Sequence, residues 1–214
     1  LRVAAPMSLL RFGLGPVVRD YLARYPDVCL EVVGGDDDPV PDGRELHLAV
    51  RVSTGGPPPH LKQRLLAQVR MELVASPEWV AKHGTISSPD ELARHRCVVL
   101  GSAPSAAHVR LHGPTGERRL TVPMALFTTS LSVARQAALD GVGPTGLPLD
   151  TCQGPMDRGE LVSLMPDWEL ARVPVVALYA GDRAMPLRMR AFLDLLVQAY
   201  SSPAHQRESA DSSR

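Results

Sequence analysis

The chain has 214 residues, of which 44% are hydrophobic, so it can bury a sizeable core and form one or two domains. Its 23 Lys and Arg residues balance its 23 Asp and Glu residues, which argues against the chain alone being a DNA-binding module. Its apolar runs are too short to span a membrane. Three cysteines without paired spacing predict no disulfide framework and fit a reducing cytoplasm.

The first stretch, residues 1–27, predicts a strand, a loop and a helix. Val3–Ala5 predicts a short buried strand, Ser8 is a natural helix N-cap, and Gly15 followed by Pro16 is a second possible helix start. The helix itself is predicted by apolar residues at i, i+3, i+4 spacing: Leu14, Val17, Val18, Tyr21, Leu22 and Tyr25. Sheets with this strand–loop–helix order bind ligands at the strand's C-terminal end, so the stretch predicts capture of a small anionic molecule.

Two more strands and an extended segment follow this helix. Val28–Val33 and Leu46–Val52 predict strands, and Leu61–Ala75 is long enough for two strands or for one that leaves the first domain. The turn-rich residues 34–43 include three adjacent aspartates. Because calcium-loop spacing and its closing glutamate are missing, we interpret them as a solvated turn and not as a metal loop.

Arg51 stands at the C-terminal end of the predicted strand Leu46–Val52, on the ligand side of an α/β sheet. Two interpretations stay open at this point. Arg51 either contacts an anion beside Ser8 or forms a surface ion pair. His47 lies on the same strand face, and we interpret it as the partner of a carboxylate.

The second half of the chain repeats the opening pattern. Met124–Thr128 predicts a strand, Thr129 or Ser130 caps the helix that follows, and Gly141 ends that helix. The tail at 201–214 is small and polar, and we expect it to be disordered. The other predicted elements are helices starting at Pro77, Ser88 and Ala184, strands Cys97–Leu100, Leu147–Leu149 and Val173–Tyr179, and a hairpin of His108–Leu111 with Arg118–Val122.

Gly141–Gly146 matches the GxGxxG dinucleotide fingerprint letter for letter. That motif must follow a strand and open a helix, whereas here it follows a predicted helix and Pro144 occupies the turn. We therefore interpret the glycines as a helix end and a tight turn into the next strand.

No constellation in the sequence predicts catalysis or metal binding. His108 and His112 have no third ligand at a suitable spacing, and the HExxH and GxSxG motifs are absent. We therefore expect no enzyme activity, no metal and no cofactor. Cys29 and Cys97 are predicted to be inert core residues, whereas Cys152, in a predicted loop, is left open as a reactive thiol.

A series of short segments carries a resemblance that covers Leu1 to about Tyr200. They are Leu1–Pro6, Leu22–Val28, Leu48–Val52, Ala75–Trp79, Asp90–Cys97, Gly141–Gly143 before Leu147–Pro148, Gly159–Val162 with Leu164–Trp168, and Ala177–Tyr179 before Arg190–Asp194. Each segment is a weak signal alone. In this order and spacing, they resemble the effector-binding (substrate-binding) domain of LysR-type transcriptional regulators.

The resemblance implies an α/β fold of two Rossmann-like subdomains joined by two crossover strands, similar to type 2 periplasmic binding proteins. It places residues 1–75 and 177–200 in regulatory subdomain I and residues 76–176 in regulatory subdomain II. The family's winged helix-turn-helix, which reads DNA, normally precedes the segment corresponding to Leu1, and it is absent from this chain.

The resemblance also implies an effector pocket in the cleft between the subdomains. By position, the pocket residues are Pro6, Met7, Ser8, Arg51 and Val52 from the first subdomain, and Thr128, Thr129, Ser130 and Gly146 from the second. The implied partners are a small anionic metabolite, DNA through the missing domain, and further copies of the chain in a homodimer or homotetramer. In that assembly, the helix at 14–25 contacts the helix at 131–139 of another copy. The alternative is a periplasmic or transporter-associated solute-binding protein of the same fold.

Overall fold

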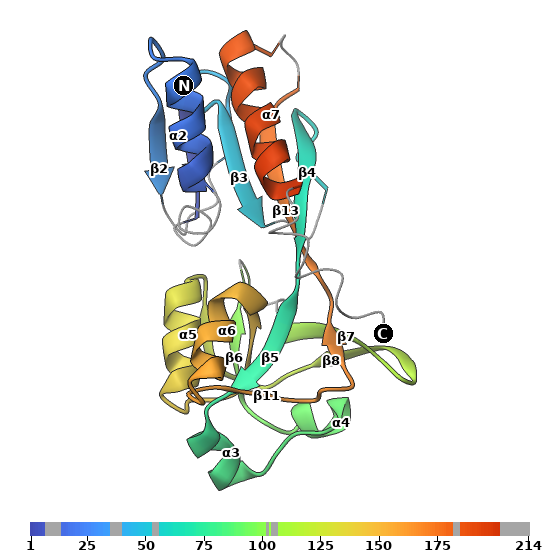
Figure 1. Cartoon of the computed structure of the whole chain (residues 1–214). Coiled ribbons are helices and arrows are strands. Elements are labelled where there is room, and N and C mark those ends of the chain that lie inside the picture. The colour runs from blue at the N-terminus through green and yellow to red at the C-terminus, as the bar shows by residue number, and fades with distance from the viewer. Residues whose placement is uncertain are drawn as a thin grey trace. The chain divides into compact units, whose positions relative to one another are not determined.

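The computed structural model describes residues 1–6, 14–34, 40–52, 56–101, 103, 107–181 and 185–201. The chain divides into two compact units, and the backbone passes between them twice (Figure 1). Unit 1 comprises Leu1–Gln68 and Val173–Arg214, and unit 2 comprises Val69–Arg172. Both divisions come several residues earlier than the expected ones at 75/76 and 176/177. The first comes earlier because the strand at 71–75 pairs with strands of unit 2.

Unit 1 is built on a sheet whose described strands have the order β2-β1-β3-β13-β4. The strands are β1 (Arg2–Ala5), β2 (Glu31–Gly34), β3 (Leu48–Val52), β4 (Leu61–Val69) and β13 (Val173–Ala180). β1 pairs in parallel with β2 and β3, whereas β13 runs antiparallel to β3. Leu48, Ala49 and Val50 are all buried, so both faces of β3 are covered.

Two helices of unit 1, α2 (Gly15–Arg24) and α7 (Leu187–Ser201), pack against each other (Figure 1). Tyr21 of α2 is fully buried, and its ring meets Phe192 of α7 edge-on at a centroid distance of 5.0 Å. The Tyr21 hydroxyl donates a 2.8 Å hydrogen bond to the backbone carbonyl of Arg188. The predicted first helix is confirmed, and it begins at the second of the two expected starts.

Unit 2 contains small sheets of order β10-β5-β11, β12-β7-β8 and β6-β9. The strands are β5 (Met71–Ala75), β6 (Cys97–Leu100), β7 (His108–Gly113), β8 (Gly116–Thr121), β9 (Met124–Thr128), β10 (Thr145–Pro148), β11 (Val162–Ser163) and β12 (Glu169–Leu170). The helices are α3 (Pro77–His83), α4 (Pro89–Leu92), α5 (Leu131–Leu139) and α6 (Leu149–Asp157). One buried cluster includes Trp79 and Met165, and a second includes Ala138 and Leu147.

Serine caps begin α3 and α4, of which the sequence analysis predicted only the one at Ser88. The Ser76 hydroxyl accepts a 3.2 Å hydrogen bond from the N–H of Trp79, and the Ser88 hydroxyl accepts one of 3.4 Å from the N–H of Glu91. A proline follows each cap, where its missing N–H costs the helix no hydrogen bond. Each cap contributes about 1 kcal/mol to helix stability.

The sequence prediction missed α6, since it placed Leu149 at the end of a strand and predicted no helix after it. Gly154 and Pro155 are poor helix formers, but Thr151, Cys152 and Pro155 are buried, so tertiary packing overrides local propensity here. Cys152 therefore lies in a helix and not in a loop. Burial raises the pKa of its thiol to about 12, which opposes a reactive role.

The second predicted strand is shorter than expected. It begins at Glu31 and not at Val28, so Cys29 precedes the strand and is exposed. The prediction that Cys29 is a core residue is therefore wrong. Cys97 is buried as predicted, and burial raises the pKa of its thiol to about 12.

Candidate ligand-binding site

The C-terminal ends of β1 and β3 lie side by side in unit 1. The register pairs Val3 with Leu48 and Ala4 with Ala49, so Pro6 follows the end of β1 on the side of the sheet where Arg51 and Val52 end β3. Pro6 and Arg51 are half-buried, and Val52 is 47% exposed. The two parallel strands thus bring a guanidinium group to the sheet edge where α/β proteins bind ligands.

Met7 and Ser8, which were expected in the same place, lie outside the described residues. Beyond them, α2 begins at Gly15 with Pro16 in its first turn. Its N-cap residue, Leu14, has no side-chain oxygen to accept a hydrogen bond from the first N–H groups.

Thr128, Thr129 and Ser130 form the junction where β9 ends and α5 begins. The Thr128 hydroxyl accepts a 3.0 Å hydrogen bond from the N–H of Ser130. Ser130 is the N-cap residue, but its side chain makes no capping hydrogen bond. The predicted position of the cap is therefore confirmed at Ser130, although the hydroxyl that stabilises the turn is that of Thr128. The first N–H groups of α5 keep their capacity to bind an anion.

Gly146 lies on β10, which packs against β6 and α5. A Cβ atom at this position would lie 2.9 Å from Cδ1 of Leu170, so close packing within unit 2 favours glycine here. The adjacent Thr145 is 1% exposed, and its Oγ1 has no hydrogen-bond partner among the described residues. The sequence analysis overlooked Thr145, although a hydroxyl residue between Pro144 and an apolar strand was a visible signal. A buried hydroxyl of this kind ordinarily forms a hydrogen bond with an ordered water or with a ligand group.

The structure thus brings the expected residues together in two sets. Pro6, Arg51 and Val52 lie at the C-terminal ends of β1 and β3 in unit 1, whereas Thr128–Ser130 are consecutive residues of unit 2, with Gly146 on another strand of that unit. The first set offers a guanidinium group and the second offers helix N–H groups, and each of these favours a carboxylate or another anion. Among the residues that the structure describes, no group of three or more His, Cys, Asp or Glu side chains could hold a metal ion.

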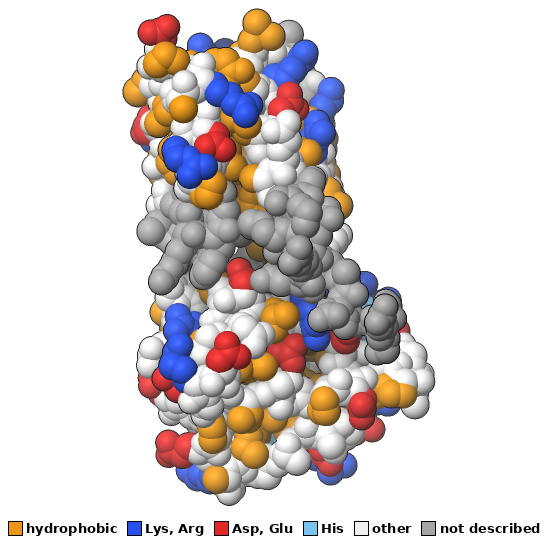
Figure 2. All heavy atoms as spheres, viewed as in Figure 1, with side chains coloured by type: hydrophobic (Ala, Val, Ile, Leu, Met, Phe, Trp, Pro, Cys, Tyr) orange, Lys and Arg blue, Asp and Glu red, His pale blue; other side chains and the backbone are white. Residues whose placement is uncertain are grey.

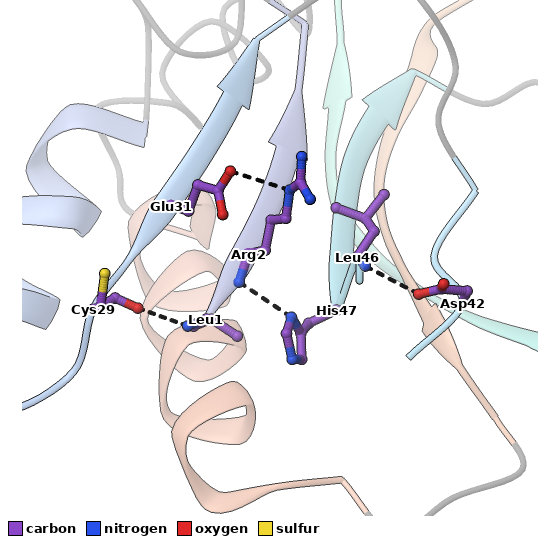
Figure 3. A network of polar contacts seen from close by, with 7 residues as sticks. All are labelled: Leu1, Arg2, Cys29, Glu31, Asp42, Leu46 and His47. Atoms are coloured by element: carbon purple, nitrogen blue, oxygen red, sulfur yellow. Dashed lines mark hydrogen bonds and ion pairs between the residues drawn. The ribbon is translucent and has the colours of Figure 1, made fainter. Parts of the chain in front are cut away.

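His47 lies just before β3, at the sheet edge opposite Arg51 (Figure 3). Its Nδ1 accepts a 3.2 Å hydrogen bond from the backbone N–H of Arg2. The predicted carboxylate partner is therefore wrong, since a backbone group of the neighbouring strand occupies this nitrogen. Burial is the largest cause that lowers the pKa of His47, and nearby positive charge, including that of Arg188, lowers it further. His47 is thus a structural acceptor for the backbone of the neighbouring strand.

The interpretation of Gly141–Gly146 as a helix end and a turn is confirmed. Gly141 follows α5 with a φ of 71°, a left-handed conformation that glycine adopts without strain. A Cβ atom on Gly143 would lie 2.6 Å from the backbone oxygen of Arg96. The motif leads into β10 at Thr145 and opens no helix, so it lacks the geometry of a dinucleotide site.

Figure 2 shows basic and acidic side chains interspersed on the visible face of both units, in agreement with the formal net charge of zero. Within the described part of the chain, none of the helices has the length and apolar character needed to cross a bilayer.

The model of the LysR substrate binding domain matches residues 1–201. The chain is 30% identical over 201 residues to the probable HTH-type transcriptional regulator LtrA of Klebsiella pneumoniae, covering 92% of this chain and 64% of that protein. It is 32% identical over 206 residues to the HTH-type transcriptional regulator PtxR of Pseudomonas aeruginosa, covering 92% of this chain and 62% of that protein.

Among solved structures, the regulatory domain of CrgA, a LysR-type transcriptional regulator from Neisseria meningitidis, has a TM-score of 0.75 and 28% identity. This match covers 92% of this chain and 97% of that one. The chain thus matches nearly all of the CrgA regulatory domain but less than two thirds of the length of LtrA and PtxR. The fold and the family match together show that this chain belongs to the family of LysR substrate-binding domains.

Proposed function

We propose that this chain is the effector-binding regulatory domain of a cytoplasmic LysR-type transcriptional regulator, and that it binds a small anionic metabolite and catalyses no reaction. A winged helix-turn-helix outside this chain would bind DNA. The family match and the regulators named LtrA and PtxR support this proposal. They also favour a regulator over the alternative of a solute-binding protein with the same fold.

The observation that carries the proposal is the placement of anion-binding groups in both units. In unit 1, Arg51 lies in the last two residues of β3, and in unit 2, Thr128–Ser130 lead from β9 into α5. We propose that one ligand contacts both sets. Arg51 would bind a carboxylate through charge-assisted hydrogen bonds, and the first turn of α5 would donate backbone N–H groups to a second polar group. The Thr145 hydroxyl is a further candidate contact.

Binding of this kind couples a metabolite to the arrangement of the two units. A ligand that contacts both units stabilises whichever arrangement lets it make all its contacts. In a full-length oligomer, that arrangement would set the spacing of the attached DNA-binding domains. This is the step by which metabolite concentration would control transcription.

For the oligomer, we propose that α2 of one copy contacts α5 of another. The inner face of α2 is buried through Val17 and Tyr21, whereas Leu22 is 38% exposed. On α5, Val133 is 47% exposed. Apolar side chains left exposed on two helices are typical of an interface. Sedimentation of the isolated domain as a strict monomer at high concentration would argue against this contact.

A thermal-shift screen of small carboxylates tests the proposed site. We expect at least one compound to raise the melting temperature of the domain, because a ligand that binds only the folded state stabilises it. Arg51→Ala should remove most of that shift. The matched control is Arg44→Ala, which removes an exposed guanidinium of the same unit away from β3. A shift that persists undiminished in Arg51→Ala would exclude Arg51 from the site.

A further inference from the structure

A groove of about 560 Å³ lies on unit 1, where the C-terminal end of α2 meets the first turns of α7. α2 contributes Arg24 and Tyr25, and α7 contributes Leu187, Arg188 and Arg190 among others. None of the expected effector-site residues lines this groove. Since α2 runs back from the C-terminal end of β1, the groove lies at the opposite edge of the sheet from Arg51.

The charges of the groove are strongly unbalanced. Three guanidinium groups, those of Arg24, Arg188 and Arg190, line it together with a single carboxylate, that of Asp194. None of these four side chains forms an ion pair with a described residue. Elsewhere in unit 1, Arg2 pairs with Glu31 at 3.3 Å. The groove therefore keeps about two uncompensated positive charges, which makes it a favourable place for an anion.

The start of α7 adds to this preference. A helix N-terminus carries a partial positive charge that acidic residues usually neutralise. The first turn of α7 contains no acidic residue, and Arg188 stands there instead. The peptide dipoles and the arginine side chains thus both favour a negatively charged ligand.

The groove also offers apolar surface to a ligand. Leu187 is 81% exposed and Tyr25 is 40% exposed, although both are large apolar or aromatic side chains. Ala191 and Leu195 contribute further apolar atoms to the lining. A ligand that fits these surfaces has a hydrophobic body as well as negative charge, and the volume suits a small molecule.

We propose that this groove binds a small organic dianion with an aromatic or aliphatic body, as a second ligand site of unit 1 distinct from the site at Arg51. Two carboxylate groups would each contact a guanidinium, which presents paired N–H donors to the two oxygens of a carboxylate. The body of the ligand would lie against Leu187 and Tyr25. The proposal does not depend on the identity of the effector or on the proposed function.

Titration of the isotope-labelled domain with benzene-1,3-dicarboxylate, followed by NMR and calorimetry, tests this proposal. We expect saturable shifts of the amides at 24–25 and 187–191. Arg24→Gln and Arg190→Gln should each weaken binding about tenfold, the usual effect of losing one hydrogen bond to a charged group. Arg44→Gln is the matched control, since this exposed arginine of unit 1 lies outside the groove, and it should leave the affinity unchanged.

Two further comparisons distinguish a specific binding site from non-specific attraction to positive charge. Benzoate should bind at least tenfold more weakly than the dicarboxylate, and Arg51→Ala should not alter dicarboxylate binding to the groove. Equal weakening by Arg44→Gln, equal affinity for benzoate, or shifts confined to residues 51–52 and 128–130 would overturn the proposal. So would the absence of dicarboxylate binding alongside binding of an acidic peptide, which would assign the groove to a protein partner. Coincident unfolding curves for all variants would show that the exposed substitutions leave the fold intact.

Discussion

Gly143→Ala tests whether the glycine-rich turn after α5 exists for close backbone packing. The added Cβ atom would lie 2.6 Å from the backbone oxygen of Arg96, a distance that folded proteins do not tolerate. Both groups belong to the backbone, so no flexible side chain can move aside. One segment must shift by at least about 0.4 Å in an interior that is packed as densely as an organic crystal.

This shift would distort a hydrogen bond between β6 and the turn before β10. The N–H of Val98 donates to the carbonyl of Pro144 over 2.8 Å, one residue after Gly143 and two residues after Arg96. Overpacking of this kind costs about 1–3 kcal/mol. With a middle value of about 2 kcal/mol and an m-value near 2 kcal/mol/M, the urea midpoint of unit 2 should fall by roughly 1 M.

Tryptophan fluorescence measures this midpoint selectively, because both tryptophans of the chain, Trp79 and Trp168, lie in unit 2. Gly15→Ala in α2 is the matched control, since its added Cβ would meet no neighbouring atom of a described residue within 4 Å, apart from its own helix. It should leave the tryptophan transition unchanged. A Gly143→Ala midpoint within error of the wild-type value would refute the packing argument. The glycine-rich turn at 141–146 would then need another explanation.

Three further predictions follow from single groups. Thr145→Val should stabilise unit 2 by about 1 kcal/mol in urea unfolding, because it removes a buried hydroxyl that lacks a partner among the described residues; a comparable loss would show that the hydroxyl is hydrogen-bonded. The pKa of His47 is lowered in the folded state, so the unfolded chain binds more protons than the folded one as the pH falls below about 6.5. Acid should therefore lower the free energy of unfolding of unit 1. His47→Asn can still accept a hydrogen bond from the Arg2 N–H. It should therefore reduce the loss of unit 1 stability between about pH 7.5 and about pH 5.5, measured by tyrosine fluorescence. An unchanged loss would show that His47 does not cause this pH dependence. Iodoacetamide should modify Cys29 alone in the native protein and all three cysteines after unfolding, as counted by mass spectrometry; rapid native modification of Cys97 or Cys152 would contradict their burial and raised pKa.

The parts of the fold that local pattern determines were predictable. Val3–Ala5, the helix at α2 and the serine-capped starts of α3 and α4 have periodicities and caps that agree with their packing. The segment Leu61–Ala75 was recognisably extended, but whether it formed one strand or two depended on its partners. β4 joins the sheet of unit 1 and β5 pairs with β10 and β11, and no local signal encodes that choice. α6 was unpredictable for the same reason, since burial and not propensity maintains it.

The candidate site was predictable only to the level of strand ends. Arg51 and Thr128–Ser130 were found because parallel strands present their C-terminal ends to ligands. The roles of individual side chains depended on contacts that no sequence spacing shows. Nδ1 of His47 is bonded to a backbone group 45 residues away, and the isolation of the Thr145 hydroxyl becomes visible only once the strands are paired.

The central claim is that one anion contacts residues of both units, and amide NMR of the labelled domain tests it most directly. A carboxylate that raises the melting temperature should, at saturation, shift the amides of residues 51–52 and 128–130 along a single binding curve. Arg51→Ala should abolish both sets of shifts together. Shifts in one unit alone, or two sets with different affinities, would contradict a shared site.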